Sequence, residues 1–196
     1  MPNWMRSRTA DSLHEHTPSS ETDELREEIL RLADPRPDDQ CIDLGAGAGH
    51  LTRRLAERTE RVFAVEATAA ISEISALGLN NVVTYPKDLM ALALPFECTD
   101  LAVSGYAFHH VHNADKRVLT ARIRRWLRPG GRLVIGDLMY SSGSFSLGSL
   151  FRPGSLPRGG QTAPPEFWVE ALRDASFEDV EYVAVSAKTG IVYGHA

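Results

Sequence analysis

The sequence is poor in features that would each have indicated a particular class of protein. It has only two cysteines among 196 residues, too few for the disulfide framework of a small secreted domain. No apolar run approaches the ~20 residues of a membrane-spanning helix, and we expect no signal peptide because the N-terminus lacks an apolar stretch. The net charge of −5 gives no support for a nucleic-acid partner. We therefore expect a soluble cytoplasmic protein that binds neither membrane nor nucleic acid.

The length is sufficient for a single α/β domain with a buried core. We expect residues 1–196 to form one domain and the protein to be a monomer or homodimer. Residues 1–20 are polar and predict either a flexible tail or a lid over a ligand. Residues 138–165 are rich in glycine, serine and proline, and so long a loop in a compact domain predicts an insert on the substrate side.

The most informative stretch runs from Cys41 to His50, where a short apolar strand meets a turn with glycine at three alternate positions: Gly45, Gly47 and Gly49. Glycine adopts positive φ easily and lets backbone approach a ligand closely. The turn leads into a helix predicted for 51–58, whose first N–H groups favour electron-rich ligand groups. Together these features predict a nucleotide pocket at the carboxyl end of a strand in an open α/β sheet.

The spacing of the glycines distinguishes between kinds of nucleotide pocket. In the dinucleotide fingerprint the third glycine follows the second by three residues, whereas Gly49 follows Gly47 by two. This spacing disfavours a nicotinamide-dependent oxidoreductase, which we keep as an alternative. Glu66 ends the next apolar strand, about 20 residues along the βαβ unit, where an acid accepts hydrogen bonds from both ribose hydroxyls of a nucleoside.

The rest of the chain alternates between helical and extended patterns. Four arginines on one predicted helix, Arg122, Arg124, Arg125 and Arg128, predict a solvated basic face. The sequence Pro129-Gly130-Gly131 predicts a turn that leads into a fifth strand. The other predicted helices cover 21–33, 68–77, 113–128 and 167–175, and the other predicted strands cover 41–44, 62–66, 81–85, 100–104, 177–184 and 187–193.

Five marks in order resemble the class I S-adenosylmethionine (SAM) methyltransferases. They are the motif Asp43-x-Gly45-x-Gly47-x-Gly49, then Glu66, Asp88, the strand end from Ser104 to His110, and Pro129-Gly130-Gly131. They cover residues 40–137, about half the chain, and the run Tyr106 to His110 also looks like small bacterial methyltransferases. The resemblance implies a Rossmann-like α/β fold: a seven-stranded, mostly parallel sheet with helices on both faces and an antiparallel C-terminal strand.

The resemblance implies SAM as the cofactor and carries a set of binding residues onto this chain. In the family an acid after the third strand holds the adenine amino group, and Asp88 matches it by position, although it also suits the N-cap of the following turn. The end of the fourth strand faces both cofactor and acceptor. The residues expected to bind the cofactor are Asp43, Gly45, Ala46, Gly47, Gly49, Glu66, Ala67, Asp88, Leu89, Ser104 and Gly105.

Methyl transfer from a sulfonium is an in-line displacement, which mainly requires alignment and exclusion of water. A general base is needed when the acceptor arrives protonated, and histidine suits this role near neutral pH. His109 and His110 are the paired histidines at the strand end, and we favour His110 as the catalytic residue, with packing as the alternative for each. We expect no metal, because adjacent histidines point apart in an extended chain.

The acceptor is expected to be a small molecule, because no appended recognition module is evident. Tyr106 and Phe108 either bracket that molecule or pack in the core, and Tyr140 and Trp168 are expected to line its pocket because they flank the insert. A second hypothesis is a protein of the same fold that binds SAM in a regulatory role without transferring methyl groups.

Overall fold

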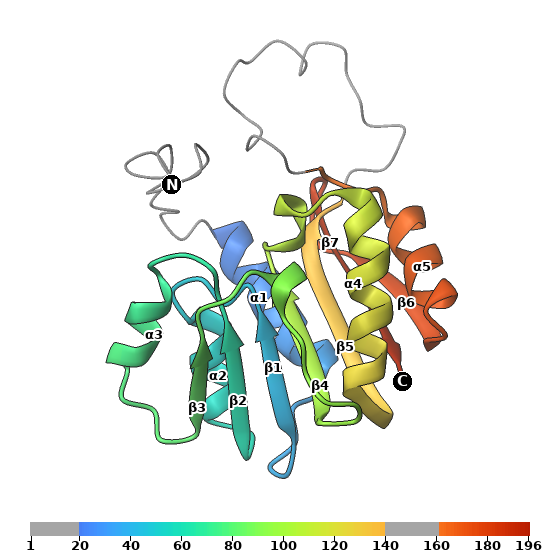
Figure 1. The fold of residues 1–196 in the computed structure, drawn as a ribbon. Coiled ribbons are helices and arrows are strands. Elements are labelled where there is room, and N and C mark those ends of the chain that lie inside the picture. The colour runs from blue at the N-terminus through green and yellow to red at the C-terminus, as the bar shows by residue number, and fades with distance from the viewer. Residues whose placement is uncertain (1–19, 140–160) are drawn as a thin grey trace, which may run out of the picture.

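In the computed structural model, which describes residues 20–139 and 161–196, the chain forms a seven-stranded sheet in the order β3-β2-β1-β4-β5-β7-β6. Figure 1 shows helices on both faces of this sheet. Strands β1 to β5 are parallel, and β7 runs antiparallel to β5 and β6. The predicted α/β sheet with an antiparallel C-terminal strand is confirmed. The predicted tail or lid at the N-terminus and most of the predicted insert lie outside the described residues.

The elements begin and end within a few residues of the predicted positions. The helices are α1 (Ser20–Ala33), α2 (His50–Ala56), α3 (Ile71–Ala76), α4 (Asn113–Trp126) and α5 (Pro165–Asp174), with short 3₁₀ turns η2 (Leu89–Ala91) and η3 (Phe108–His110). The strands are β1 (Gln40–Leu44), β2 (Arg61–Val65), β3 (Val82–Tyr85), β4 (Thr99–Gly105), β5 (Leu127–Leu138), β6 (Glu178–Ala184) and β7 (Thr189–His195).

Two apolar layers form because side chains alternate between the faces of each strand. On one face, Cys41, Leu101 and Val103 pack with residues of α1 and α2. On the other face, Ile42 and Ala102 pack with residues of α4 and α5. In Figure 1, α4 and α5 lie in front of the sheet and α1 and α2 lie behind it. The central strands are therefore covered on both sides, which leaves their ends as the places where polar groups collect.

The direction in which the chain winds reverses between β1 and β4, which lie side by side at the centre of the sheet. Loops leaving the carboxyl ends of two such strands turn away from each other, and ligands of open α/β sheets bind in the crevice between them. Here these loops are the glycine-rich turn after β1 and η3 after β4. The sheet order thus places the predicted nucleotide-binding turn beside the paired histidines.

The predicted turn at Pro129-Gly130-Gly131 lies inside β5 and does not precede it. Leu127 pairs with Thr99 and Arg132 pairs with Leu101, so residues 128–131 loop out of the pairing with β4. Gly130 adopts a φ of 76° at this place, a conformation that glycine reaches without steric cost. Because residues 128–131 loop out, Leu127, the first residue after α4, can pair with β4.

The four arginines in and just after the end of α4 are at least partly exposed, as predicted, and each also has a partner. Arg122 donates to the carbonyl oxygens of Met90 and Leu92 and lies 5.5 Å from the ring centroid of Trp126. Arg124 and Arg125 lie over aromatic rings, those of Phe177 and Phe96. The residue pattern of one helix cannot predict these contacts, because the aromatic rings and carbonyl oxygens that serve as partners belong mostly to other elements.

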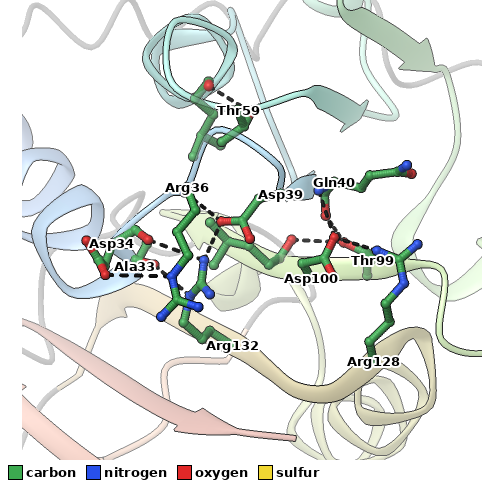
Figure 2. A network of polar contacts seen from close by, with 12 residues as sticks. Ala33, Asp34, Arg36, Asp39, Gln40, Thr59, Thr99, Asp100, Arg128 and Arg132 are labelled. Atoms are coloured by element: carbon green, nitrogen blue, oxygen red, sulfur yellow. Dashed lines mark hydrogen bonds and ion pairs between the residues drawn. The ribbon is translucent and has the colours of Figure 1, made fainter.

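At the amino ends of β1 and β4 the fourth arginine, Arg128, belongs to a network of ion pairs, drawn in Figure 2. Arg132 is buried and pairs with the buried Asp39. Arg128 pairs with Asp100 at 2.5 Å, and Asp100 also accepts from the backbone N–H of Gln40 at 2.9 Å. These residues line a pocket of about 340 Å³. Because Arg132 pairs with Asp39 and Arg128 with Asp100, most of the charges that line the pocket are already engaged.

Candidate active site

The glycine-rich turn after β1 is held tightly on one side. The backbone N–H groups of Gly45 and Ala46 both donate to the carbonyl oxygen of Val65, each at 2.9 Å. A Cβ atom at Gly45, where φ is 78°, would lie 2.2 Å from the Cβ of Ala107. Only glycine fits there, because the turn presses against the residue that precedes η3. The glycine-rich turn and the segment that leads into His109 are therefore in direct contact.

The other side of the same turn is open. Gly47 has a φ of 55°, and a Cβ atom placed on it would meet no atom within 4 Å. Its backbone N–H donates to Glu66 Oε2 at 3.0 Å, and Glu66 Oε1 accepts from the N–H of Thr68 at 2.8 Å. The predicted ribose-binding carboxylate thus lies directly against the glycine turn, beside the exposed Ala67. A nucleoside that entered here would find bare backbone and a carboxylate side by side.

Asp43 lies beneath the turn with one oxygen satisfied and one not. Its side chain is buried, Oδ2 accepts from the hydroxyl of Thr52 at 2.6 Å, and Oδ1 is buried without a hydrogen-bond partner within the described part of the chain. Burial raises the pKa of Asp43 to about 6, and the nearby Glu66 adds to the shift. Since buried carboxylate oxygens normally have partners, the unsatisfied Oδ1 fits a group supplied by a ligand, as a SAM site requires.

Asp88 and Leu89 lie at the third strand's exit, as predicted. Asp88 is the N-cap of η2, and its side chain accepts from the N–H of Met90 at 2.8 Å. Asp88 is exposed and Leu89 is half-buried. The capping alternative for Asp88 is confirmed. Its contact with adenine stays a prediction, which is compatible with capping because a carboxylate has a second oxygen to accept a hydrogen bond.

Ser104 and Gly105 already serve the packing of the sheet. The hydroxyl of Ser104 is buried and donates to the carbonyl oxygen of Leu44 at 2.8 Å, which ties the ends of β1 and β4 together. A Cβ atom at Gly105 would lie 2.9 Å from Leu51 Cδ1. Both residues therefore position the strand end, and a direct contact of either residue with a cofactor stays a prediction.

His109 has a carboxylate partner, Asp137. Its Nδ1 lies 2.7 Å from Asp137 Oδ1, and its backbone N–H donates to Asp137 Oδ2 at 2.9 Å. The side chain of His109 is 13% exposed and that of Asp137 is 2% exposed. His110 is exposed, and its ring centroid lies 4.0 Å from that of His109. The geometry therefore favours His109 as the catalytic residue over His110, the residue favoured from the sequence.

Asp137 is absent from the residues predicted from the sequence, although a signal for it exists. It follows the apolar residues of β5, on the same face as Leu133 and Ile135, which pack against α4 and α5. Carboxyl ends of neighbouring parallel strands meet at one edge of a sheet. An acid at the end of β5 is therefore expected beside the residues that follow β4, where His109 lies.

The four residues expected to contact the acceptor separate in space. Phe108 and Trp168 are buried and pack edge to face, with ring centroids 5.5 Å apart, so packing is the alternative that describes Phe108. Tyr106 has a φ of 55° and shares a hydrogen bond with Thr22 of α1, and burial raises its pKa. Tyr140 lies outside the described residues. Acceptor contacts of these side chains stay predictions.

A second residue not predicted from the sequence is Lys116 on α4. Its side chain is buried, its Nζ donates to Asn113 Oδ1 at 2.9 Å and to the carbonyl oxygen of Gln161, and it lies 5.4 Å from the ring centroid of Trp168. Burial lowers the pKa of Lys116 to about 8, while the charge of Asp137 opposes that shift. The ammonium group thus ties the start of α4 to the segment that precedes α5.

Within residues 20–139 and 161–196, no cluster of three or more histidine, cysteine or acidic side chains has the arrangement of a metal site. Over the same ranges, none of the helices combines the length and apolar character needed to cross a bilayer.

Comparisons with known proteins agree with this geometry. Residues 42–135 match the model of a family described as a methyltransferase domain. An uncharacterized methyltransferase of Anoxybacillus flavithermus is 31% identical over 114 residues, which are 58% of this chain and 54% of that protein. An uncharacterized methyltransferase of Exiguobacterium sibiricum is 32% identical over 117 residues, which are 59% of this chain and 54% of that protein. The chain therefore spans about half the length of the curated relatives it matches.

Solved structures agree on the fold. The 1,6-didemethyltoxoflavin-N1-methyltransferase of Burkholderia thailandensis, with bound 1,6-didemethyltoxoflavin and S-adenosylhomocysteine, aligns with a TM-score of 0.70 at 22% identity over 91% of this chain and 79% of that one. The cyclase SpnF aligns with a TM-score of 0.74 at 16% identity over 88% of this chain and 80% of that one.

The glycine turn, the two acids beside it and the sheet order agree with the family match. Over residues 42–135 this chain is similar to the methyltransferase-domain family.

Proposed function

We propose that this protein transfers the methyl group of SAM to a small-molecule acceptor and that His109 takes the acceptor's proton. The observation that carries the proposal is the turn from Gly45 to Gly49, which is closed toward Ala107 and open at Gly47. It lies against Glu66 and above the unsatisfied Oδ1 of Asp43. These features supply what a nucleoside with a charged amino-acid tail needs: bare backbone, a ribose acceptor and a buried anionic group.

Each acid has a separate role in holding the cofactor. Glu66 accepts from the ribose hydroxyls, Asp88 accepts from the adenine amino group, and the ionised Asp43 balances positive charge near the glycine turn. When bound, SAM supplies an electrophilic methyl group on a sulfonium that is already a good leaving group. The chain's task is then to orient the acceptor and exclude water, and orientation alone can contribute about 7–11 kcal/mol to lowering the barrier.

His109 is placed to complete this task, because it follows the strand end that abuts the glycine turn and is held by Asp137. A base positioned in this way typically adds about 10²–10⁴-fold to the rate when the acceptor arrives protonated. The small-molecule nature of the acceptor is supported by the net charge of −5, which does not favour a nucleic-acid substrate.

A second candidate is a protein of this fold that binds SAM without methylating. The specific observation in its favour is the structural likeness to SpnF, which is described as a cyclase. One fold can carry different chemistries, so the fold by itself does not choose between the two.

Calorimetry and label transfer together test the proposal. We expect SAM and S-adenosylhomocysteine to bind with micromolar dissociation constants, about −8 kcal/mol, and NAD to give no heat. Incubation with methyl-labelled SAM and a bacterial metabolite extract is then expected to yield a labelled small molecule. Binding without any transfer favours the second candidate, and absence of binding overturns both.

A matched pair of variants locates the binding site. Glu66→Gln removes a ribose-binding charge and is expected to weaken S-adenosylhomocysteine binding about tenfold or more, since charged hydrogen bonds contribute about 1.5–3 kcal/mol. Glu60→Gln changes an exposed acid that precedes the amino end of β2, opposite to Glu66 at the carboxyl end, and serves as the control. Equal affinities in the two variants would place the nucleoside elsewhere.

A further inference from the structure

The carboxylate of Asp137 receives more donors than its place at a strand end requires. His109 offers it both the backbone N–H, 2.9 Å from Oδ2, and Nδ1, 2.7 Å from Oδ1. The backbone N–H of Leu138 also donates to Oδ1 at 2.7 Å. Asp137 as a whole residue is 1% exposed. Three hydrogen-bonding contacts from two segments hold the buried carboxylate of Asp137 in place. The carboxylate in turn holds the ring of His109.

This arrangement determines which imidazole nitrogen carries the proton. An ionised carboxylate only accepts hydrogen bonds, so the contact between Nδ1 and Oδ1 requires Nδ1 to be the donor. The neutral ring is then the Nδ1–H tautomer, and its lone pair lies on Nε2. Within the described part of the chain, Nε2 has no hydrogen bond. The nitrogen that can act as a base is therefore the one directed away from Asp137.

The charged and titratable groups around the pair come from three elements. His110 follows on η3 with its ring beside that of His109. Lys116 on α4 and Tyr106 at the end of β4 each interact electrostatically with Asp137. The charge of Asp137 raises the pKa of Lys116, against the lowering that burial causes.

We propose that Asp137 is a positioning residue: it fixes the orientation and the tautomer of His109, so that Nε2 of His109, and not His110, faces the acceptor as a general base. The proton passes from the acceptor to Nε2, the imidazolium that forms is stabilised by the carboxylate, and the proton later leaves to water. The catalytic step in this inference rests on the proposed function. The tautomer of His109 depends only on its contact with Asp137 and can be measured without cofactor or acceptor.

The arrangement also restricts the acceptor's chemistry. A base with a fixed lone pair is useful for a nucleophile that arrives with a proton, such as a hydroxyl or an ammonium group. A thioether brings no proton and would gain nothing from it. The site is therefore built for an acceptor that loses a proton during methyl transfer, and a thioether does not fit this requirement.

Nitrogen NMR of the intact chain without cofactor tests the positioning role. The seven histidines are labelled with ¹⁵N in the ring, and His109 and His110 are assigned from His109→Gln and His110→Gln. Above neutral pH we expect His109 to show the pyrrole-type signal on Nδ1 and the pyridine-type signal on Nε2. In Asp137→Asn one amide oxygen must serve three donors, and we expect the Nδ1–H tautomer to lose its dominance.

Asp100→Asn is the matched control, since it also removes a carboxylate from the sheet but at the opposite end, in the pair with Arg128. It should leave the His109 signals unchanged. If Asp137→Asn does not fold, the native spectrum decides by itself: an Nε2–H tautomer at His109 overturns the proposal. Unchanged His109 signals in a folded Asp137→Asn variant overturn it as well.

Binding and transfer measurements separate this inference from the proposed function. Asp137→Asn should bind S-adenosylhomocysteine within about twofold of the native chain, and should lower kcat in the label-transfer assay by on the order of 10²-fold or more, as loss of an orienting acid does elsewhere. A native Nδ1–H tautomer with no SAM binding would leave Asp137 as the positioning residue and reject methyl transfer. A kcat within about threefold of native would reject the positioning role alone, since a positioned base typically contributes far more.

Discussion

The two ends of the central strands are built from similar residues but in opposite ways. At the amino ends, Arg132 and Asp39 are buried as a pair, and Arg128, Asp100 and their backbone partners satisfy one another. At the carboxyl ends, Asp43 keeps an unpartnered buried oxygen, and the glycine turn takes positive φ at three positions. Satisfied charge fixes the sheet at one end, whereas at the other end an unsatisfied group and bare glycine backbone offer contacts that a ligand would complete.

The same difference between the two ends argues against the pocket at the amino ends as the active site. The pocket of about 340 Å³ lies at the amino ends and is lined by arginines and aspartates that pair with one another. A ligand there would have to break ion pairs before it gained contacts. At the carboxyl ends a ligand bound as proposed would complete Asp43 and cover Gly47, at the cost of the contact of Glu66 with the turn.

The largest expected effect comes from Arg132→Met at the amino ends. The substitution leaves the buried Asp39 without its ionic partner, and removing one member of a buried pair costs about 3–5 kcal/mol. Urea unfolding should show this loss while S-adenosylhomocysteine binding to the folded fraction stays unchanged. A loss below about 1 kcal/mol, the size expected of an exposed pair, would mean that the two ends do not differ as described.

Next in size is the pH-dependent effect of Asp43→Asn at the carboxyl ends. Burial raises the pKa of Asp43 to about 6, above the ~3.9 of an unfolded aspartate. The folded state therefore binds the proton more tightly, and the ionised side chain costs stability above pH 6, on the order of 3 kcal/mol. This cost declines as the pH falls from about 6 to about 4 and is absent below that range.

We therefore expect Asp43→Asn to be more stable than the native chain at about pH 7.5 and to lose that advantage by about pH 4, when unfolding free energies are compared across this range. Its affinity for SAM should fall, because the neutral amide no longer balances positive charge. An advantage that is equal at both pH values would show that folding does not raise the pKa of Asp43.

A pair of glycine variants compares the two ends directly. Gly47 and Gly130 have φ values of 55° and 76°, and a Cβ atom on either would meet nothing within 4 Å. Alanine at each should cost about 1–2 kcal/mol of strain. Only Gly47→Ala should also weaken S-adenosylhomocysteine binding, by about tenfold or more, because its methyl group enters the space of the ligand. Calorimetry on both variants measures this, and equal affinities would move the ligand away from the turn.

The smallest effect is expected for Arg128→Met. The ion pair with Asp100 is 39% and 25% exposed on its two sides, and pairs of this kind contribute about 0–1 kcal/mol. Thermal unfolding at low and high salt should show little change. A loss as large as that of Arg132→Met would show that the whole network, and not its buried pair alone, stabilises these strand ends.

Much of the fold could be predicted from the sequence, because the signals are local. The glycine spacing from Gly45 to Gly49, the acid at Glu66 and the alternation of apolar residues each lie within a few positions of one another, and each sets a backbone conformation or a buried face. The turn at Pro129 to Gly131 is predicted before the strand and lies within it, because the pairing of Leu127 with Thr99 is not a local feature.

What the sequence by itself determined is the nucleotide-binding turn, the order of the elements and the family that they indicate. Only the tertiary structure decided that His109 meets the carboxylate of Asp137, since Asp137 lies 28 residues further along the chain. The same holds for the buried Lys116, and for Ser104 and Phe108, whose side chains are engaged in packing. Partners on different strands are set by sheet register and burial, and neither is encoded in the spacing of residues within one segment.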